Sequence, residues 1–224
     1  MYATRIWDLP TRLFHWALAI CVVGLVVTAN IGGNAMNWHF RFGYSVLTLL
    51  LFRISWGFVG GRWSRFVSFV YSPASLLRHL RGESPATFTA GHSPTGALSV
   101  FAMLLVLLAQ VGSGLFADDD IAFAGPLSAL VSGDTVSLAT GYHKEVGKVI
   151  LIVLVALHLL AIAYYKWVRK EDLVRPMFAG DKVLSTPVEP SKDTAATRLL
   201  ALGLLLLCAY GVNRLIEFGA SSGF

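Results

Sequence analysis

Charged residues are scarce in this sequence, and they are unevenly distributed. Asp, Glu, Lys and Arg make up 14% of the 224 residues, whereas an ordinary soluble domain carries about 25%. The charges gather between long stretches that have almost none. The core of a soluble domain could bury one or two such stretches. A chain of 224 residues is too short to cover all of its apolar stretches in this way. The shortage of charge therefore excludes an ordinary soluble domain and indicates a protein of the lipid bilayer.

Cysteine and the common catalytic motifs are also rare or missing. The two cysteines, Cys21 and Cys208, lie inside apolar runs, where we expect them to pack as small apolar side chains rather than form a disulfide or a metal site. The sequence has no phosphate-binding loop, no nucleophile triad and no Cys/His metal motif. The formal net charge of +5 does not indicate nucleic-acid binding, because basic residues also gather in the cytoplasmic loops of membrane proteins.

The sequence does contain five apolar runs, each of a length that suits a helix crossing a bilayer. They cover residues 13–29, 40–59, 96–117, 143–168 and 195–216. We therefore predict an all-α integral membrane helical bundle, in contact with membrane lipid. Tryptophan and tyrosine residues near the ends of the runs fit the aromatic belts of a membrane surface.

Lys and Arg are distributed asymmetrically between the loops. Most of them lie before the first run, after the second and after the fourth, whereas residues 118–142 have four aspartates and no Lys or Arg. The positive-inside rule predicts a multi-pass protein of a bacterial inner (cytoplasmic) membrane with its N-terminus in the cytoplasm. Asp118, Asp119 and Asp120 then face the periplasm. A basic partner could dock there, although a solvated loop without a partner is the simpler interpretation.

Four of the six histidines lie in or at the edge of the apolar runs, where an ionisable side chain is costly and commonly functional. His15 is near the cytoplasmic end of the first run, and His39 is at the outer end of the second. The fourth run carries His143 at its outer end and His158 nearer the cytoplasm. Any one of them alone could be a hydrogen-bonded interior histidine, but the four pair by depth.

The spacing of His143 and His158 puts both on nearly one side of a regular helix. Their fifteen-residue separation corresponds to about 22 Å of rise and about 60° of rotation. His158 can then meet His15, and His143 can meet His39. Two bis-histidine sites at two depths are suited to holding two haem irons for transmembrane electron transfer. The loop residue His92, like His79, has no partner at its depth and is predicted not to be a ligand.

Gly43 and Gly147 each follow an outer histidine by four residues and so share its helix face. A glycine there would leave room for a porphyrin plane, although glycine also serves close helix packing. Arg53 lies deep inside the second run, about 21 Å beyond His39 along the helix. Its guanidinium could bind a haem propionate, and snorkelling to the headgroups is an equally good interpretation.

Several short stretches together resemble the bacterial cytochrome b561 family, which includes the b-type subunits of nickel–iron hydrogenases and stand-alone quinone-linked cytochromes b. They are residues 7–12 (WDLPTR), 14–16 (FHW), 39–44 (HFRFGY), 52–57 (FRISWG), 91–94 (GHSP), 142–144 (YHK) and 157–158 (LH). The resemblance covers roughly residues 1–182. It implies one haem ligand on the first helix, one on the second and two on the fourth, which correspond to His15, His39, His143 and His158.

From this resemblance we expect a four-helix haem domain at residues 1–182, a linker at 183–194 and an additional C-terminal transmembrane helix at 195–224. The expected cofactors are two haems b, held without covalent attachment because the C-x-x-C-H motif is absent. The implied function is electron transfer between the quinone pool and a redox partner, which is a periplasmic c-type cytochrome or a dehydrogenase or hydrogenase subunit.

Two other functions remain open from the sequence. One is a stand-alone quinone-linked oxidoreductase such as a superoxide oxidase, although electron transfer is favoured over independent catalysis. The other is a haem-free transporter or scaffold, which would show no visible absorption. The sequence identifies no quinone site, no direction of electron flow, no oligomeric state and no role for the fifth helix.

Overall fold

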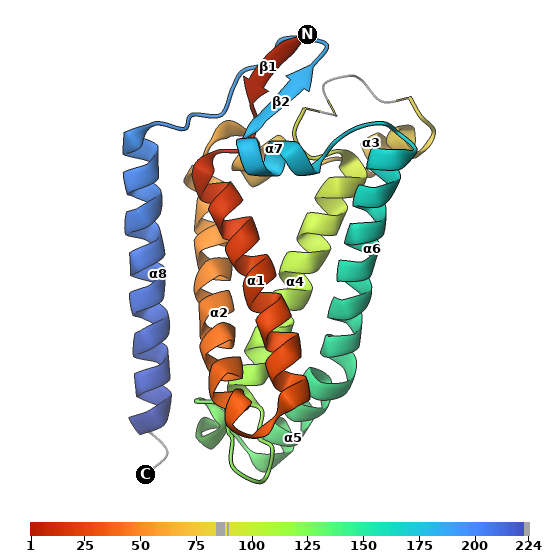
Figure 1. Cartoon of the computed structure of the whole chain (residues 1–224). Helices are drawn as coiled ribbons and strands as arrows, with labels where there is room; N and C mark the ends of the chain where they lie inside the picture. Colours follow the sequence, from red (N-terminus) through yellow and green to blue (C-terminus); the bar gives the residue numbers. More distant parts are fainter. Residues whose placement is uncertain (84–87, 89, 222–224) are drawn as a thin grey trace. The chain divides into compact units, whose positions relative to one another are not determined.

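The computed structural model describes residues 1–83, 88 and 90–221 and confirms the prediction of an all-α bundle (Figure 1). The long helices are α1 (Leu9–Ile31), α2 (Met36–Val59), α4 (Pro94–Phe116), α6 (Lys148–Trp167) and α8 (Ala195–Ser221). The short helices are α3 (Pro73–Leu80), α5 (Gly133–Gly141) and α7 (Val174–Ala179). Single 3₁₀ turns form at η1 (Gly33–Ala35), η2 (Arg62–Ser64), η3 (Phe66–Ser68) and η5 (Ser128–Leu130), and a π-helical turn, η6 (Tyr142–Gly147), joins α5 to α6.

Within the described residues, five helical segments are long and apolar enough to cross a membrane: 9–31, 33–59, 94–116, 133–167 and 195–221. They correspond to the five predicted runs. Large apolar side chains stay exposed on them, for example Ile20 at 67%, Leu105 at 69% and Leu207 at 65%. Such surfaces are unfavourable in water but normal against lipid tails. The chain is therefore a multi-pass membrane protein.

The fourth segment differs most from its predicted bounds, because it begins at Gly133 rather than at His143. Ser132 precedes α5, and its hydroxyl accepts a hydrogen bond from the Thr135 N–H, as is typical of a helix N-cap. Residues 133–142 include several polar residues and were therefore assigned to the loop. The loop before this segment is correspondingly shorter than the sequence indicated.

A two-stranded antiparallel sheet was not predicted. Strand β1 (Tyr2–Arg5) pairs with β2 (Asp181–Leu184), with Tyr2 opposite Leu184 and Arg5 opposite Asp181 (Figure 1). The Arg5 guanidinium reinforces the pairing, since its Nε donates to Asp181 Oδ1 at 2.6 Å. Strands of four residues are too short for alternation along the sequence to reveal them.

Contacts within the chain divide it into two compact units, and the long helices contribute to both. Unit 1 contains the described residues among 1–15, 53–102 and 155–203. Unit 2 contains the described residues among 16–52, 103–154 and 204–224.

Unit 1 is built around a small apolar cluster and one buried carboxylate. The cluster consists of Ile6, Trp7, Ala90 and Leu184. Asp8 is fully buried and directly precedes α1. Its carboxylate accepts hydrogen bonds from the Thr11 N–H at 2.9 Å, the Ser64 hydroxyl at 2.6 Å and the Trp56 indole N–H at 3.3 Å. Asp8 therefore caps α1 and links it to α2 and η2.

Unit 2 has a mainly apolar interior. Its most deeply buried residues include Val46, Leu47, Leu50 and Phe52 of α2, Leu104, Leu107, Val111 and Leu115 of α4, Leu151 of α6 and Val212 of α8. The buried hydroxyl of Thr28 is satisfied within α1, where it donates to the Gly24 carbonyl at 2.7 Å. Buried polar side chains are thus few in this unit, which makes its two histidines, His39 and His143, stand out.

Candidate cofactor-binding site

Unit 1 brings His15 of α1 together with His158 of α6. Their ring centroids are 6.4 Å apart, and the ring planes are inclined by 52°. Both side chains are half-buried. The two histidines lie on apolar helices and are more than a hundred residues apart in sequence. They form one of the two histidine pairs that the sequence analysis predicts from depth in the membrane.

Unit 2 brings together His39, in the first turn of α2, and His143, in η6. Their ring centroids are 6.2 Å apart, and the planes are inclined by 84°. His39 Nδ1 lies 3.1 Å from the Leu25 carbonyl oxygen, and His143 Nδ1 lies 2.8 Å from the Gln110 carbonyl oxygen. A carbonyl oxygen can only accept, so Nδ1 carries the proton in each ring. The Nε2 lone pair then remains available for a metal.

His143 lies in a π-helical turn, which the sequence analysis did not foresee. The turn spans Tyr142–Gly147 and separates two α-helical segments of one continuous membrane span. Such π turns are rare and frequently occur at functional sites. The turn therefore marks the His143 end of the span as locally specialised.

Gln110 of α4 contacts His143 twice. Its main-chain carbonyl accepts from His143 Nδ1, and its side-chain Nε2 donates to the His143 carbonyl at 2.9 Å. The Ser113 hydroxyl lies 3.4 Å from the same Nδ1. These residues were missed from the sequence, although a glutamine within an otherwise apolar run was an available signal.

The two glycines that share a spacing from the outer histidines do not share the same surroundings. A Cβ added at Gly43 would meet nothing within 4 Å. A Cβ at Gly147 would lie 2.0 Å from Gln110 Oε1 and 2.8 Å from the Tyr142 ring. Gly147 thus allows Gln110 to approach closely, whereas Gly43 borders open space. A third glycine, Gly114, faces His143, since its Cβ would lie 2.9 Å from His143 Cε1.

Arg53 is buried in unit 1, with only 3% of its surface exposed. Its guanidinium carbon lies 4.8 Å from the centre of the Phe66 ring and 6.0 Å from that of Phe69. Its Nη1 atom has no hydrogen-bond partner among the described residues. This is not the solvent-reaching geometry of a snorkelling arginine.

His92 also lies in unit 1, between two aromatic rings. Its ring centroid is 4.7 Å from that of Trp7 and 4.4 Å from that of Phe69. Burial, reinforced by the positive charges of Arg53 and Lys182, lowers the pKa of His92 to about 3. The imidazole is therefore neutral at physiological pH.

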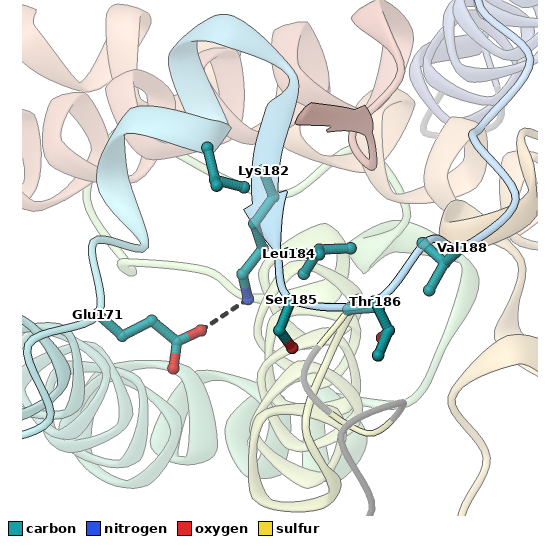
Figure 2. Close-up of a pocket in the computed structure, with 8 residues that line it drawn as sticks. Glu171, Lys182, Leu184, Ser185, Thr186 and Val188 are labelled. Carbon is teal, nitrogen blue, oxygen red and sulfur yellow. Dashed lines mark ion pairs between the residues drawn. The ribbon is translucent and has the colours of Figure 1, made fainter. Parts of the chain in front are cut away.

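A hollow of about 210 Å³ in unit 1 lies around β2 and the segment that follows it (Figure 2). Its lining residues are Ala90, Glu171, Lys182, Val183, Leu184, Ser185, Thr186 and Val188. Lys182 Nζ lies 2.7 Å from Glu171 Oε1, so the charged groups of the hollow already form an ion pair. None of the four paired histidines lines it, and the hollow does not extend the candidate site.

Comparison with known proteins gives a family match over most of the chain. A family model described as prokaryotic cytochrome b561 matches residues 6–180. The probable Ni/Fe-hydrogenase B-type cytochrome subunit of Azotobacter chroococcum mcd 1 is 27% identical, over 80% of this chain and 88% of that protein. Its namesake from Azotobacter vinelandii is 26% identical over the same shares. The probable Ni/Fe-hydrogenase 1 B-type cytochrome subunit of Escherichia coli (strain K12) is 32% identical over 49% of this chain and 57% of that protein. No solved structure matches.

Proposed function

Because the chain belongs to the prokaryotic cytochrome b561 family, we propose that it transfers electrons across the membrane through two haems b. His15 and His158 bind one haem, and His39 and His143 bind the other. Membership of the family supports membrane electron transfer and haem b. The number of haems, their ligands and the redox partners are our proposal.

The separation of the paired rings is the observation that carries this proposal. With a metal–nitrogen bond of about 2 Å, two imidazoles that held one iron between them would have ring centres about 6 Å apart. The separations in the two pairs are 6.4 and 6.2 Å. Direct stacking or a hydrogen bond between rings would not require the same distance in both units.

The protonation of the His39–His143 pair also supports haem binding. Both Nδ1 atoms donate to main-chain carbonyls, of Leu25 and Gln110 respectively. A ligating histidine commonly donates its other ring N–H in this way, which fixes the tautomer and the ring orientation. The two rings are thus oriented for binding through Nε2.

Arg53 supplies a buried positive charge in the same unit as His15 and His158. Haem carries two carboxylates, and a guanidinium suits a carboxylate in charge and geometry. The unpartnered Nη1 atom of Arg53 fits this role. We therefore propose that Arg53 binds a propionate of the haem between His15 and His158, in agreement with the first of the two interpretations of its sequence position.

When bound, haem supplies a one-electron iron couple. The histidines hold the iron, and the apolar helices around them keep water away, which together with the ligand type sets the potential. Gln110 holds His143 through two hydrogen bonds, one from the ring Nδ1 to the Gln110 carbonyl and one from the Gln110 amide to the His143 carbonyl. Gly43 and Gly147 belong to the proposed site through their helix positions, Gly43 by leaving open space and Gly147 by admitting Gln110.

The names of the relatives indicate the kind of partner. They are cytochrome subunits of Ni/Fe-hydrogenases, so we propose that this chain connects a partner oxidoreductase, or a periplasmic c-type cytochrome, to a membrane quinone. We further propose that the protein lies in the bacterial inner membrane with its N-terminus in the cytoplasm, as the distribution of Lys and Arg indicates.

The test is a reduced-minus-oxidised visible spectrum of the purified chain, with haem quantified per polypeptide. We expect two haems b per chain, removable without breaking a covalent bond. One haem per chain would refute the second bis-histidine site, and no visible absorption would favour the haem-free transporter or scaffold.

A further inference from the structure

Arg53 and His92 come from different parts of unit 1 and share one neighbour, Phe69. The Phe69 ring lies 6.0 Å from the Arg53 guanidinium carbon and 4.4 Å from the His92 ring centre. Arg53 Nη1 and His92 Nδ1 are both buried, and neither has a hydrogen-bond partner among the described residues. Buried polar atoms are normally paired, because an unpaired one costs about 1–3 kcal/mol. Two of them around the same ring indicate a ligand that accepts hydrogen bonds.

The charges of this cluster, which we call the Arg53–His92 cluster, specify the kind of acceptor. Arg53 is permanently charged and forms no ion pair with a described carboxylate. The buried carboxylate of Asp8 already accepts hydrogen bonds from Thr11, Ser64 and Trp56. His92 is neutral, because burial and the nearby positive charges lower its pKa to about 3. The cluster therefore offers one neutral donor and one positive charge that forms no ion pair with a described carboxylate, although the buried Asp8 carboxylate lies close enough to act on it electrostatically.

We propose that His92 binds, together with Arg53, a propionate carboxylate of the haem held by His15 and His158. This inference rests on the proposed function, because it assumes a haem at that pair. It gives a binding role to His92, a histidine that is not expected to be an iron ligand. Its ring is fixed between Trp7 and Phe69, so the donor is oriented before the haem binds.

A carboxylate explains the cluster better than a neutral head group such as a quinone. A quinone carbonyl would satisfy the hydrogen bonds but would give the unpartnered Arg53 Nη1 atom no anionic acceptor. A carboxylate accepts from both donors, and its hydrogen bond to the guanidinium is charge-assisted and therefore stronger. A protonated His92 would add a second positive charge beside Arg53, whereas the neutral ring leaves the two charges balanced.

The first experiment is resonance Raman spectroscopy of the haem-loaded full chain, which reports hydrogen bonding to the propionates through their bending bands. We expect His92→Leu to shift one propionate band and His92→Asn, which keeps a donor, to restore it in large part. The matched control is His79→Leu, because His79, in α3, also belongs to the stretch between α2 and α4 and its Nε2 lies 3.4 Å from Thr95 Oγ1. Unshifted propionate bands in His92→Leu would overturn the proposal.

The second experiment uses haem dimethyl ester, whose propionates carry no charge. The full chain with both His39 and His143 changed to Leu is made without haem and then supplied with haem b or the ester. We expect this double variant, in which Arg53 and His92 are intact, to bind haem b about tenfold or more tightly than the ester. Adding His92→Leu should reduce this preference several-fold. An undiminished preference would refute the role of His92. A second contradicting result is also defined. If His92→Leu keeps the full preference for haem b over the ester but loses quinone-linked reduction of the haem, the role of His92 in propionate binding is refuted and the cluster is assigned to a quinone.

The proposed function and this inference fail in different ways. A wild-type chain that binds no haem removes the proposed function. A wild-type chain with two haems, whose propionate bands do not respond to His92, removes only the inference.

Discussion

The shortest hydrogen bonds of the histidine rings in unit 2 are to main-chain oxygens of neighbouring helices. His39 donates to Leu25 of α1, and His143 donates to Gln110 of α4. Changing the side chain of Leu25 or Gln110 leaves the carbonyl acceptor in place. The orientation of each ring therefore depends on how closely the helices approach, which makes small residues along them important.

Single substitutions of the histidines test the proposed pairing. We expect His39→Leu and His143→Leu to remove the same haem, because one remaining imidazole holds the iron weakly. His15→Leu and His158→Leu should both remove the other haem. Haem per chain and a redox titration together identify which haem is affected, since a haem held by one histidine is detected by its changed potential. Losses that grouped His15 with His143 would contradict the pairing, and His79→Leu should retain both haems.

Gly114 offers a finer test of the geometry around His143. In Gly114→Ala the new Cβ would lie 2.9 Å from His143 Cε1 and 3.2 Å from Nδ1, so the ring must move. We expect a cost of about 1–3 kcal/mol, typical of an overfilled interior, and a selective change in the spectrum and potential of the haem bound by His143.

The matched control is Gly112→Ala on the same helix, where an added Cβ meets nothing within 4 Å. It should leave both haems unchanged. Identical behaviour of the two alanine variants would show that close approach at Gly114 does not position the ring.

Polarity and spacing along the chain were enough to single out the four histidines and to group them as the structure brings them together. They did not reveal Gln110 or Gly114. The role of these two residues depends on the register between α4 and η6, and a periodic pattern within one helix carries no information about its neighbour. For Arg53 the sequence left two interpretations equal, because burial of a long side chain is decided by tertiary packing.

Among the elements, η6 explains why the rise and rotation between His143 and His158 cannot be calculated from their sequence separation alone. The estimates of about 22 Å and about 60° between His143 and His158 assume a regular α-helix. A π turn has hydrogen bonds from i to i+5 and more residues per turn. The regular-helix rotation therefore does not hold across Tyr142–Gly147. The existence of the span was predictable from its composition, but the local π geometry was not.

Helix α8 is preceded by a segment with several contacts in unit 1. The Ser191 hydroxyl donates to the Ile6 carbonyl at 2.7 Å, and the Asp193 carboxylate accepts from Arg5 at 2.9 Å and from Arg198 at 2.7 Å. In unit 2 the other end of α8 approaches Pro126, because a Cβ at Gly219 would lie 2.0 Å from the Pro126 carbonyl oxygen. The segment before α8 is thus more than a passive linker.

Two truncations separate the role of α8 from that of the preceding segment. Ending the chain after Thr194 keeps Ser191 and Asp193, and we expect both haem spectra to be largely retained, as a separate haem domain at residues 1–182 requires. Ending it after Leu184 removes the hydrogen bonds of both residues and should lower the free energy of unfolding by about 2–4 kcal/mol. Thermal unfolding in detergent measures the difference. Loss of haem from the chain that ends after Thr194 would place α8 in the haem domain.

At the scale of the whole molecule, two of the acidic residues after α4 stabilise the loop in which they lie. Asp119 Oδ1 accepts from the N–H groups of Ile121, Ala122 and Phe123 at 2.8–2.9 Å. These hydrogen bonds, with Phe123 first, lower the pKa of Asp119, so the turn loses its carboxylate acceptor only as the pH falls through that lowered value. Asp118 similarly accepts from the Asp120 N–H at 2.7 Å. Both aspartates therefore shape the loop, which the sequence alone did not indicate.

Asp120 is the better position at which to test partner docking. Its φ of 59° lies in the left-handed region, which asparagine tolerates well, so Asp120→Asn removes charge with little change of backbone. If the loop steers a basic partner, the electron-transfer rate to that partner at low salt should fall about two- to threefold, and its salt dependence should weaken. Stopped-flow measurement over a range of ionic strength tests this expectation. A rate and salt dependence equal to those of the wild type would leave the loop with a structural role alone.

The small sheet has a consequence for the order in which the protein is made. Strand β1 precedes all the long helices in the chain and is synthesised before them, whereas its partner β2 follows α6 and α7. The N-terminal strand must therefore wait, unpaired, until the translocon has received all four histidine-bearing positions, because Leu184 is synthesised after His158. Closure of the sheet is thus a late event in biogenesis. All four proposed haem ligands are synthesised before β1 and β2 can pair.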